Sequence, residues 1–224
     1  MLDGTTYYFT AFALDTDDTI IDVQSNSITT DFWPLPSAYQ EVEYIQSSWS
    51  QRIDTWITPN SNTKVQVKLS CTNNPWYVSV WYYNGNDIQD RRVFLSNGME
   101  WTVDIPWWSW VWKRINWWNW TYWKVEEIEF GNFYIKNLVS WQTYTWTAWT
   151  FTWTSTIKLC RDAWLNLNDS NVFYYVKIRD WNTLVRDLIP CYRKSDNIIG
   201  MYDIVNNQFY TNAWSGTFIK WPKK

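Results

Sequence analysis

The chain has 224 residues and a net charge of −3, and its 19 basic residues are scattered, which argues against a nucleic-acid partner. It contains no histidine, so the usual general base and the commonest metal ligand are both absent. No apolar run approaches the roughly 18 residues of a membrane helix, and no signal peptide follows Met1. Three cysteines (Cys71, Cys160 and Cys191) are too few for a disulfide framework and lack zinc-site spacing.

Residues 1–32 are predicted to form two strands around an acidic turn, Asp15 to Asp18. The segment "LDGTTYYFTAFALD" resembles the tyrosine-corner strand of fibronectin type III-like domains, with the match carried by Leu2, Gly4, Thr5 and Tyr7. Because a two-stranded hairpin is marginal alone, we expect Met1 not to be a natural start. The chain is then predicted to be the end of a longer multidomain protein.

Residues 33–40 are predicted to be a stiff linker, because they contain Pro34 and Pro36. The second block, residues 41–224, consists of short alternating runs with turn signals between them. In "TKVQVKLSC" the residues Val65, Val67, Leu69 and Cys71 share one predicted face and alternate with polar residues. The run "VFYYVKIRD" is interpreted in the same way. In the latter, one face is predicted to hold Val172, Tyr174, Val176 and Ile178. This pattern predicts an all-β, two-sheet antiparallel sandwich or jelly roll.

Tryptophan and glycine are distributed abnormally. The chain has 22 tryptophans and only 6 glycines, whereas average usage would give roughly 16 glycines. Trp181 and Trp214 stand in predicted tight turns, where a positive φ favours glycine. The stretch 105–123 holds eight tryptophans and would be a flexible loop with glycine in their place. Six of these tryptophans are predicted to lie in loops with exposed indoles: Trp107, Trp108, Trp110, Trp117, Trp118 and Trp120.

We interpret most of these tryptophans as standing where the natural protein has glycine. UGA is a stop codon in the standard code, tryptophan in some bacteria and glycine in a few uncultivated bacterial lineages. A gene that uses UGA for glycine, translated with the table that assigns tryptophan, would give this pattern. The alternative is a chain that is truly rich in tryptophan, as a stacking platform for sugars or a membrane-interface belt.

Both ends of the second block carry a family pattern. The segment "EYIQSSWSQRIDTWITPNSNTKVQV" and the closing run from "YYVKIRDWNTLVRD" to "TNAWSGTFIKWP" resemble concanavalin A-like, LamG-like jelly-roll domains of bacterial surface and phage tail proteins. Glycines of that pattern coincide with Trp49, Trp56, Trp181, Trp214 and Trp221. The resemblance implies a jelly-roll fold that serves lectins, adhesins, hydrolases and spacers alike, so it does not identify a ligand.

Carboxylates in "KVEEIEF" are the candidates for catalysis. Some glycoside hydrolases of this fold carry two carboxylates two residues apart on one strand face, and Glu127 and Glu129 would share a face. The central aspartate expected between two glutamates is missing, so we interpret Glu126, Glu127 and Glu129 as a solvated strand face. The pair Glu41 and Glu43 is a weaker candidate.

Oxygen-rich turns and tyrosines are the candidates for binding. Asp15, Asp17 and Asp18, and the segment 84–87, could supply oxygen ligands to Ca²⁺, but both are interpreted as turns. Tyr82 or Tyr83 could stack on a sugar, although a tyrosine in a half-buried strand usually belongs to the core. Cys71 lies on the apolar face of its strand and is also interpreted as a core residue. The sequence therefore predicts no catalytic residue, no metal site and no cofactor, and leaves the ligand-binding residues unknown.

The sequence predicts a non-enzymatic carbohydrate- or cell-surface-binding module of a multidomain bacterial surface or phage tail protein. Its expected partners are a glycan or cell-surface ligand and the neighbouring domains of a longer chain. Its expected location is the cell surface or a virion. The alternatives are a glycoside hydrolase on the same fold and a structural spacer without a ligand.

Overall fold

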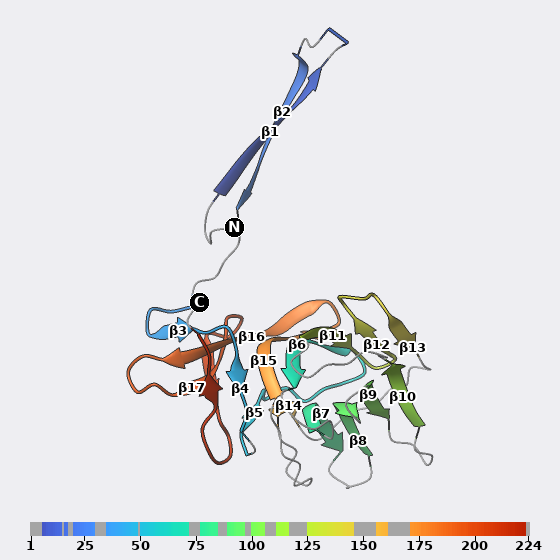
Figure 1. The fold of residues 1–224 in the computed structure, drawn as a ribbon, viewed down its shortest axis with the longest axis vertical. Coiled ribbons are helices and arrows are strands. Elements are labelled where there is room, and N and C mark those ends of the chain that lie inside the picture. The colour runs from blue at the N-terminus through green and yellow to red at the C-terminus, as the bar shows by residue number, and fades with distance from the viewer. Residues whose placement is uncertain are drawn as a thin grey trace. The chain divides into compact units, whose positions relative to one another are not determined.

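The computed structural model describes residues 6–14, 16–17, 20–29, 35–48, 50–71, 77–84, 89–96, 100–105, 111–116, 125–145, 156–160 and 171–222. The chain divides into two compact units, Met1–Pro36 and Ser37–Lys224 (Figure 1). The division falls inside the predicted linker, residues 33–40. Among the described residues every regular element is a strand and there is no helix.

The first unit contains an antiparallel hairpin. Its strands are β1 (Thr6–Leu14) and β2 (Ile20–Thr29), paired from Thr6 with Thr29 to Leu14 with Ile20. Thr16 and Asp17 form an exposed turn between them. The predicted pair of strands is confirmed, whereas Asp15 and Asp18 of the predicted acidic turn lie outside the described residues. The side chain of Tyr7 lies outside the described residues, so its tyrosine-corner role stays a prediction.

The second unit contains two antiparallel sheets, which Figure 1 shows as two layers. The six-stranded sheet has the order β10-β9-β8-β7-β14-β5. Its strands are β5 (Arg52–Asp54), β7 (Tyr77–Asn84), β8 (Gln89–Ser96), β9 (Glu100–Ile105), β10 (Val111–Asn116) and β14 (Lys158–Cys160).

The eleven-stranded sheet follows the path β13-β12-β11-β6-β15-β16-β17-β18, with β3, β4 and β19 paired at its side. Its longer strands are β6 (Thr63–Cys71), β11 (Glu126–Phe130), β15 (Asn171–Asp180), β16 (Thr183–Arg193) and β17 (Ile199–Asp203). Its shorter strands are β3 (Tyr39–Glu41), β4 (Ile45–Gln46), β12 (Tyr134–Asn137), β13 (Thr143–Thr145), β18 (Gln208–Thr211) and β19 (Ile219–Lys220).

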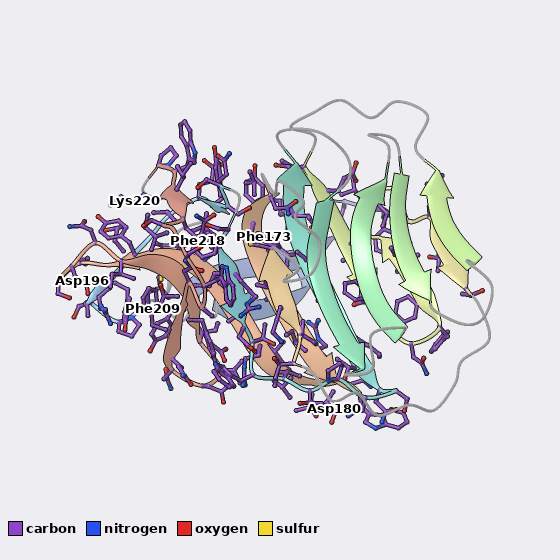
Figure 2. The ribbon with its side chains drawn as sticks, turned by 90° about the horizontal axis from the view of Figure 1, so that it is seen from below. Phe173, Asp180, Asp196, Phe209, Phe218 and Lys220 are labelled. Carbon is purple, nitrogen blue, oxygen red and sulfur yellow. The ribbon has the colours of Figure 1, made fainter. Side chains whose placement is uncertain are left out.

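A hydrophobic core lies between the two sheets. Every second side chain of β6 and β11 is buried in it, as the alternating sequence predicts. Figure 2 marks Phe173 and Phe218, two of its largest fully buried side chains. Ile53 of β5 and Leu159 of β14 contribute from the smaller sheet. The arrangement is a β-sandwich-like all-β fold, as predicted at that level, and each fully buried aliphatic or aromatic side chain contributes about 1.5–3 kcal/mol.

Two sequence-based expectations about this unit are wrong. The stretch 105–123, expected to be a loop if its tryptophans stand for glycines, contains strand β10, which includes Trp112. Residues 106–110 and 117–124 lie outside the described residues, so the predicted exposure of their tryptophans is not tested. The expected alternation of β15 is also interrupted, because its pairing with β6 shifts register between Phe173 and Tyr175.

Candidate functional site

A row of polar and aromatic side chains covers the face of the larger sheet that points away from the core. These side chains alternate with core residues and are half-buried. They are Lys64, Gln66 and Lys68 of β6, Glu127 and Glu129 of β11, Tyr134 and Lys136 of β12, and Tyr175, Lys177 and Arg179 of β15. We call this row the outer face.

A β-bulge in β15 places two consecutive tyrosines outside the core. Phe173 is buried opposite Leu69, and Val176 is buried opposite Val67. Strict alternation cannot bury both, so the register shift inserts one extra residue between them. Tyr174 and Tyr175 are accordingly both half-buried. The prediction that Tyr174 shares a face with Val176 is therefore wrong, and the bulge is the reason.

A hydrogen-bond network joins three strands on the outer face. Gln66 Nε2 donates to Glu127 Oε1 at 2.9 Å and to the Tyr175 hydroxyl at 3.0 Å. The Tyr175 hydroxyl itself donates to Glu127 Oε1. Arg179 Nη1 donates to Gln66 Oε1 at 3.1 Å. Because both ends of the Gln66 amide have partners, the network fixes its orientation and presents an ordered set of donors and acceptors.

Each outer-face carboxylate of β11 is bound by a tyrosine hydroxyl. The Tyr134 hydroxyl donates to Glu129 Oε1 at 2.7 Å, as Tyr175 does to Glu127. Burial raises the pKa of both tyrosines, and the bonded carboxylates raise it further. The phenols therefore stay protonated at neutral pH and act as hydrogen-bond donors. Lys177 forms an ion pair of 2.9 Å with Asp187 on the same side.

Aromatic rings extend the outer face at the bulge. The ring centroid of Tyr174 lies 5.2 Å from that of Tyr44, which lies 5.9 Å from that of Trp221. Lys68 Nζ lies 5.5 Å from the Tyr174 centroid. These distances lie within the range of aromatic and cation–π contacts. Tyr174 thus links the polar network of its neighbour Tyr175 to an aromatic surface.

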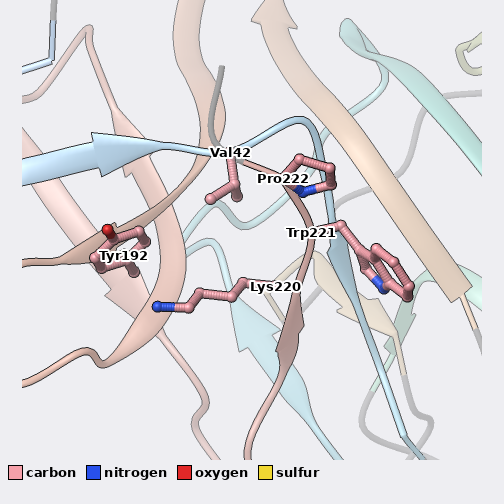
Figure 3. A pocket seen from close by; sticks show the side chains of 5 residues that line it. All are labelled: Val42, Tyr192, Lys220, Trp221 and Pro222. Carbon is pink, nitrogen blue, oxygen red and sulfur yellow. The ribbon is translucent and has the colours of Figure 1, made fainter.

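A shallow apolar pocket lies beside this surface (Figure 3). Its volume is about 300 Å³, and it is lined by Val42, Tyr192, Lys220, Trp221 and Pro222. The Lys220 ammonium lies 3.6 Å from the centre of the Tyr192 ring, so its charge is already engaged by an aromatic face. Within the described residues this pocket has few polar groups to orient a ligand, unlike the outer face.

The three candidate carboxylates of β11 lie in two different environments. Glu127 and Glu129 share a face, as predicted. Both are half-buried and hydrogen-bonded, which differs from the expected solvated strand face. Glu126 is only 2% exposed and accepts a bond of 2.6 Å from Asn137 Nδ2, so its predicted exposure is wrong. The cause is alternation, because Glu126 occupies a core-facing position of β11.

The remaining candidates that the structure describes do not come together in one site. Glu41 ends β3, and Glu43 is exposed just after it. Cys160 and Cys191 are buried. No group of three acidic or cysteine side chains suited to a metal ion occurs within the described ranges. Asp15, Asp18, residues 85–88 and the side chains of Cys71, Tyr82 and Tyr83 lie outside those ranges.

The sequence alone does not identify Gln66, Tyr175 and Arg179 as members of one hydrogen-bond network. Alternation places Gln66 and Tyr175 on the polar side of their strands, but it does not show that the two side chains meet. The available signal is the tyrosine doublet at 174–175, which interrupts the alternation and can indicate a bulge. Long-range pairing of β15 with β6 and of β6 with β11 then brings the three side chains together.

No protein-family model, curated protein or solved structure matches the chain. No helix formed by the described residues is long and apolar enough to cross a membrane.

Proposed function

We propose that residues 41–224 form a non-enzymatic carbohydrate- or cell-surface-binding module on a concanavalin A-like jelly roll. In this proposal the last strands of a fibronectin III-like domain precede it, in a bacterial surface or phage tail protein. The outer-face network of Gln66, Glu127, Tyr175 and Arg179, beside the Tyr174 ring, carries the proposal. Sugar recognition needs ordered polar groups for hydroxyls and an aromatic ring for the apolar face of the pyranose.

The chemistry of this network favours binding over catalysis. Glu127 and Glu129 already accept hydrogen bonds from tyrosines, whose raised pKa keeps them protonated. A binding site benefits from such fixed groups, because less side-chain freedom is lost when a ligand arrives. A hydrolase instead needs one carboxyl group able to give up its proton and another able to act as base or nucleophile.

A glycoside hydrolase is the second candidate function. Residues two apart on a strand have Cα atoms roughly 7 Å apart, and Glu127 and Glu129 occupy that spacing on one face. Carboxyl groups of inverting hydrolases lie about 6.5–9.5 Å apart. A spacer without any ligand is the third candidate, and it requires nothing of the outer-face side chains.

A glycan array separates the three candidates. We expect the purified chain to bind a subset of glycans without cleaving them, and Tyr175→Phe and Tyr174→Ala to weaken that binding at least tenfold. Tyr202→Phe is the matched control, because Tyr202 packs against Tyr39 elsewhere on the sheet. Cleavage of a polysaccharide that disappears in Glu127→Gln or Glu129→Gln would establish the hydrolase instead. Absence of any binding would favour the spacer.

A further inference from the structure

Three exposed tryptophans have a backbone conformation that suits glycine. The φ angles of Trp56, Trp141 and Trp181 are 57°, 61° and 54°. This is the left-handed region, where the Cβ of an L-residue crowds the following carbonyl oxygen and glycine has no such penalty. The other described non-glycine residues with positive φ are Asn197, Asn207 and Cys160. Asparagine adopts this region comparatively often, whereas a bulky side chain seldom does.

Packing does not explain why tryptophan stands at these three positions. Trp56, Trp141 and Trp181 are 68%, 69% and 67% exposed. An indole in a core could offset backbone strain by the apolar area that it buries. These indoles bury little area, so the strain has no comparable compensation, and the positions gain nothing specific from a large ring. Lys136 lies 4.4 Å from the Trp141 ring centre, but such an exposed cation–π contact is weak.

The turn at Trp181 shows most directly that the backbone conformation favours glycine. Asp180 pairs with Thr183, so Trp181 and Asn182 form a two-residue hairpin loop between β15 and β16. Only the first of these two residues has a positive φ. That is the φ pattern of a type II′ turn, whose first central residue is typically glycine. The amide of Trp181 also donates to the Asn62 carbonyl at 3.1 Å, which holds the turn in this conformation.

Trp56 and Trp141 lie at two other irregular positions of the backbone, where residues in the left-handed conformation are common. The amide of Thr55 donates to the Ile157 carbonyl, and the amide of Ile157 donates to the Ile57 carbonyl, so Trp56 is an extra residue between two paired ones. β-Bulges commonly place glycine at such a position. Trp141 ends the loop between β12 and β13, which is closed by a bond of 2.9 Å from the Asn137 amide to the Gln142 carbonyl. Hairpin loops of this length often end in a left-handed residue.

We infer that the native protein carries glycine at positions 56, 141 and 181. A UGA codon that the source organism reads as glycine, translated here as tryptophan, accounts for all three. The inference is independent of the proposed function, because the outer-face network contains no tryptophan. It also means that the indoles at these turns are not a ligand platform.

Substitution separates backbone strain from the simple removal of an exposed ring. We expect Trp56→Gly, Trp141→Gly and Trp181→Gly each to raise Tm by about 2–4 °C, the shift that a modest stabilisation produces in a chain of this size. The matching alanine variants should gain less, because alanine keeps the Cβ that crowds the backbone. Trp214→Gly is the control, since Trp214 is 59% exposed without a positive φ, and it should not raise Tm.

Codon identity and peptide mass provide the direct test. We expect UGA at codons 56, 141 and 181 of the gene, and glycine masses at these positions in peptides of protein isolated from its source. Tryptophan masses or UGG codons there would overturn the inference. Alanine variants as stable as the glycine variants, or more stable, would also overturn it, because removal of the ring would then explain the gain.

Discussion

Replacement of Asp203 by alanine should be strongly destabilising. Asp203 is fully buried at the end of β17. Its Oδ1 accepts bonds of 3.0 Å from the amides of Asp187 and Val205, and its Oδ2 accepts one of 2.7 Å from Asn206 Nδ2. Arg186 Nε lies 3.5 Å from the same Oδ2. The carboxylate thus joins β16, β17 and the turn before β18.

The expected loss follows from the groups that the substitution leaves unpaired. Removal of one partner from a buried charged pair costs about 3–5 kcal/mol. Arg186 Nε keeps a bond of 3.1 Å to the Thr55 carbonyl, so we expect the lower end, about 3 kcal/mol, which lowers Tm by about 6–12 °C. Asp203→Asn should lose less, because its amide oxygen still accepts the backbone bonds.

Urea unfolding followed by circular dichroism measures this loss. The matched control is Asp196→Ala, which also removes an aspartate bound to an arginine, with Arg193 Nη2 at 2.6 Å. That pair is exposed, so its removal should have a much smaller effect. A free energy of unfolding for Asp203→Ala equal to that of Asp196→Ala would refute the reasoning. A change in the m-value would show instead that the unfolding transition itself had changed.

Three further predictions concern packing, pH and the two units. Gly200→Ala should destabilise by about 1–3 kcal/mol in a thermal melt, because the new Cβ would lie 2.1 Å from the Tyr210 carbonyl oxygen; an unchanged Tm would contradict this. Burial raises the pKa of the Cys191 thiol from 9.0 to about 12. The protonated thiol therefore contributes fully to the free energy of unfolding below pH 9, and this contribution is lost as pH rises toward 12. Unfolding free energies should therefore fall less steeply above pH 9 in Cys191→Ala than in the parent chain. A shortened chain that starts at Ser37 should keep the Tm of the second unit, and a large loss would show that residues 1–36 stabilise it.

Local patterning predicts most strands of this protein, since alternation is a property of neighbouring residues. The predicted run "TKVQVKLSC" coincides with β6, and the run at 172–180 differs from β15 by one residue. Tight-turn chemistry likewise predicts the positive φ of Trp181, which is confirmed. The same expectation for Trp214 is wrong, because the positive φ of that turn belongs to Gly216.

The candidate site was less predictable because it depends on long-range register. The bulge that places Tyr174 beside Tyr175, outside the core, arises from the pairing of β15 with β6, about a hundred residues earlier in the chain. Glu126 shows the same limit, because its burial depends on which face of β11 meets the core. A carboxylate run carries no hydrophobic signal that would assign that face, so exposure was the default expectation.

The location of glycan binding tests the central claim most directly. Affinities for one array-selected glycan should be compared between two variants, Tyr175→Phe on the outer face and Lys220→Ala in the pocket beside it. Tyr175→Phe removes the hydroxyl that donates to Glu127, and we expect it to weaken binding at least tenfold while Lys220→Ala leaves the affinity within about twofold. The opposite order, with Lys220→Ala abolishing binding and Tyr175→Phe leaving it intact, would contradict the assignment of the outer face as the binding surface.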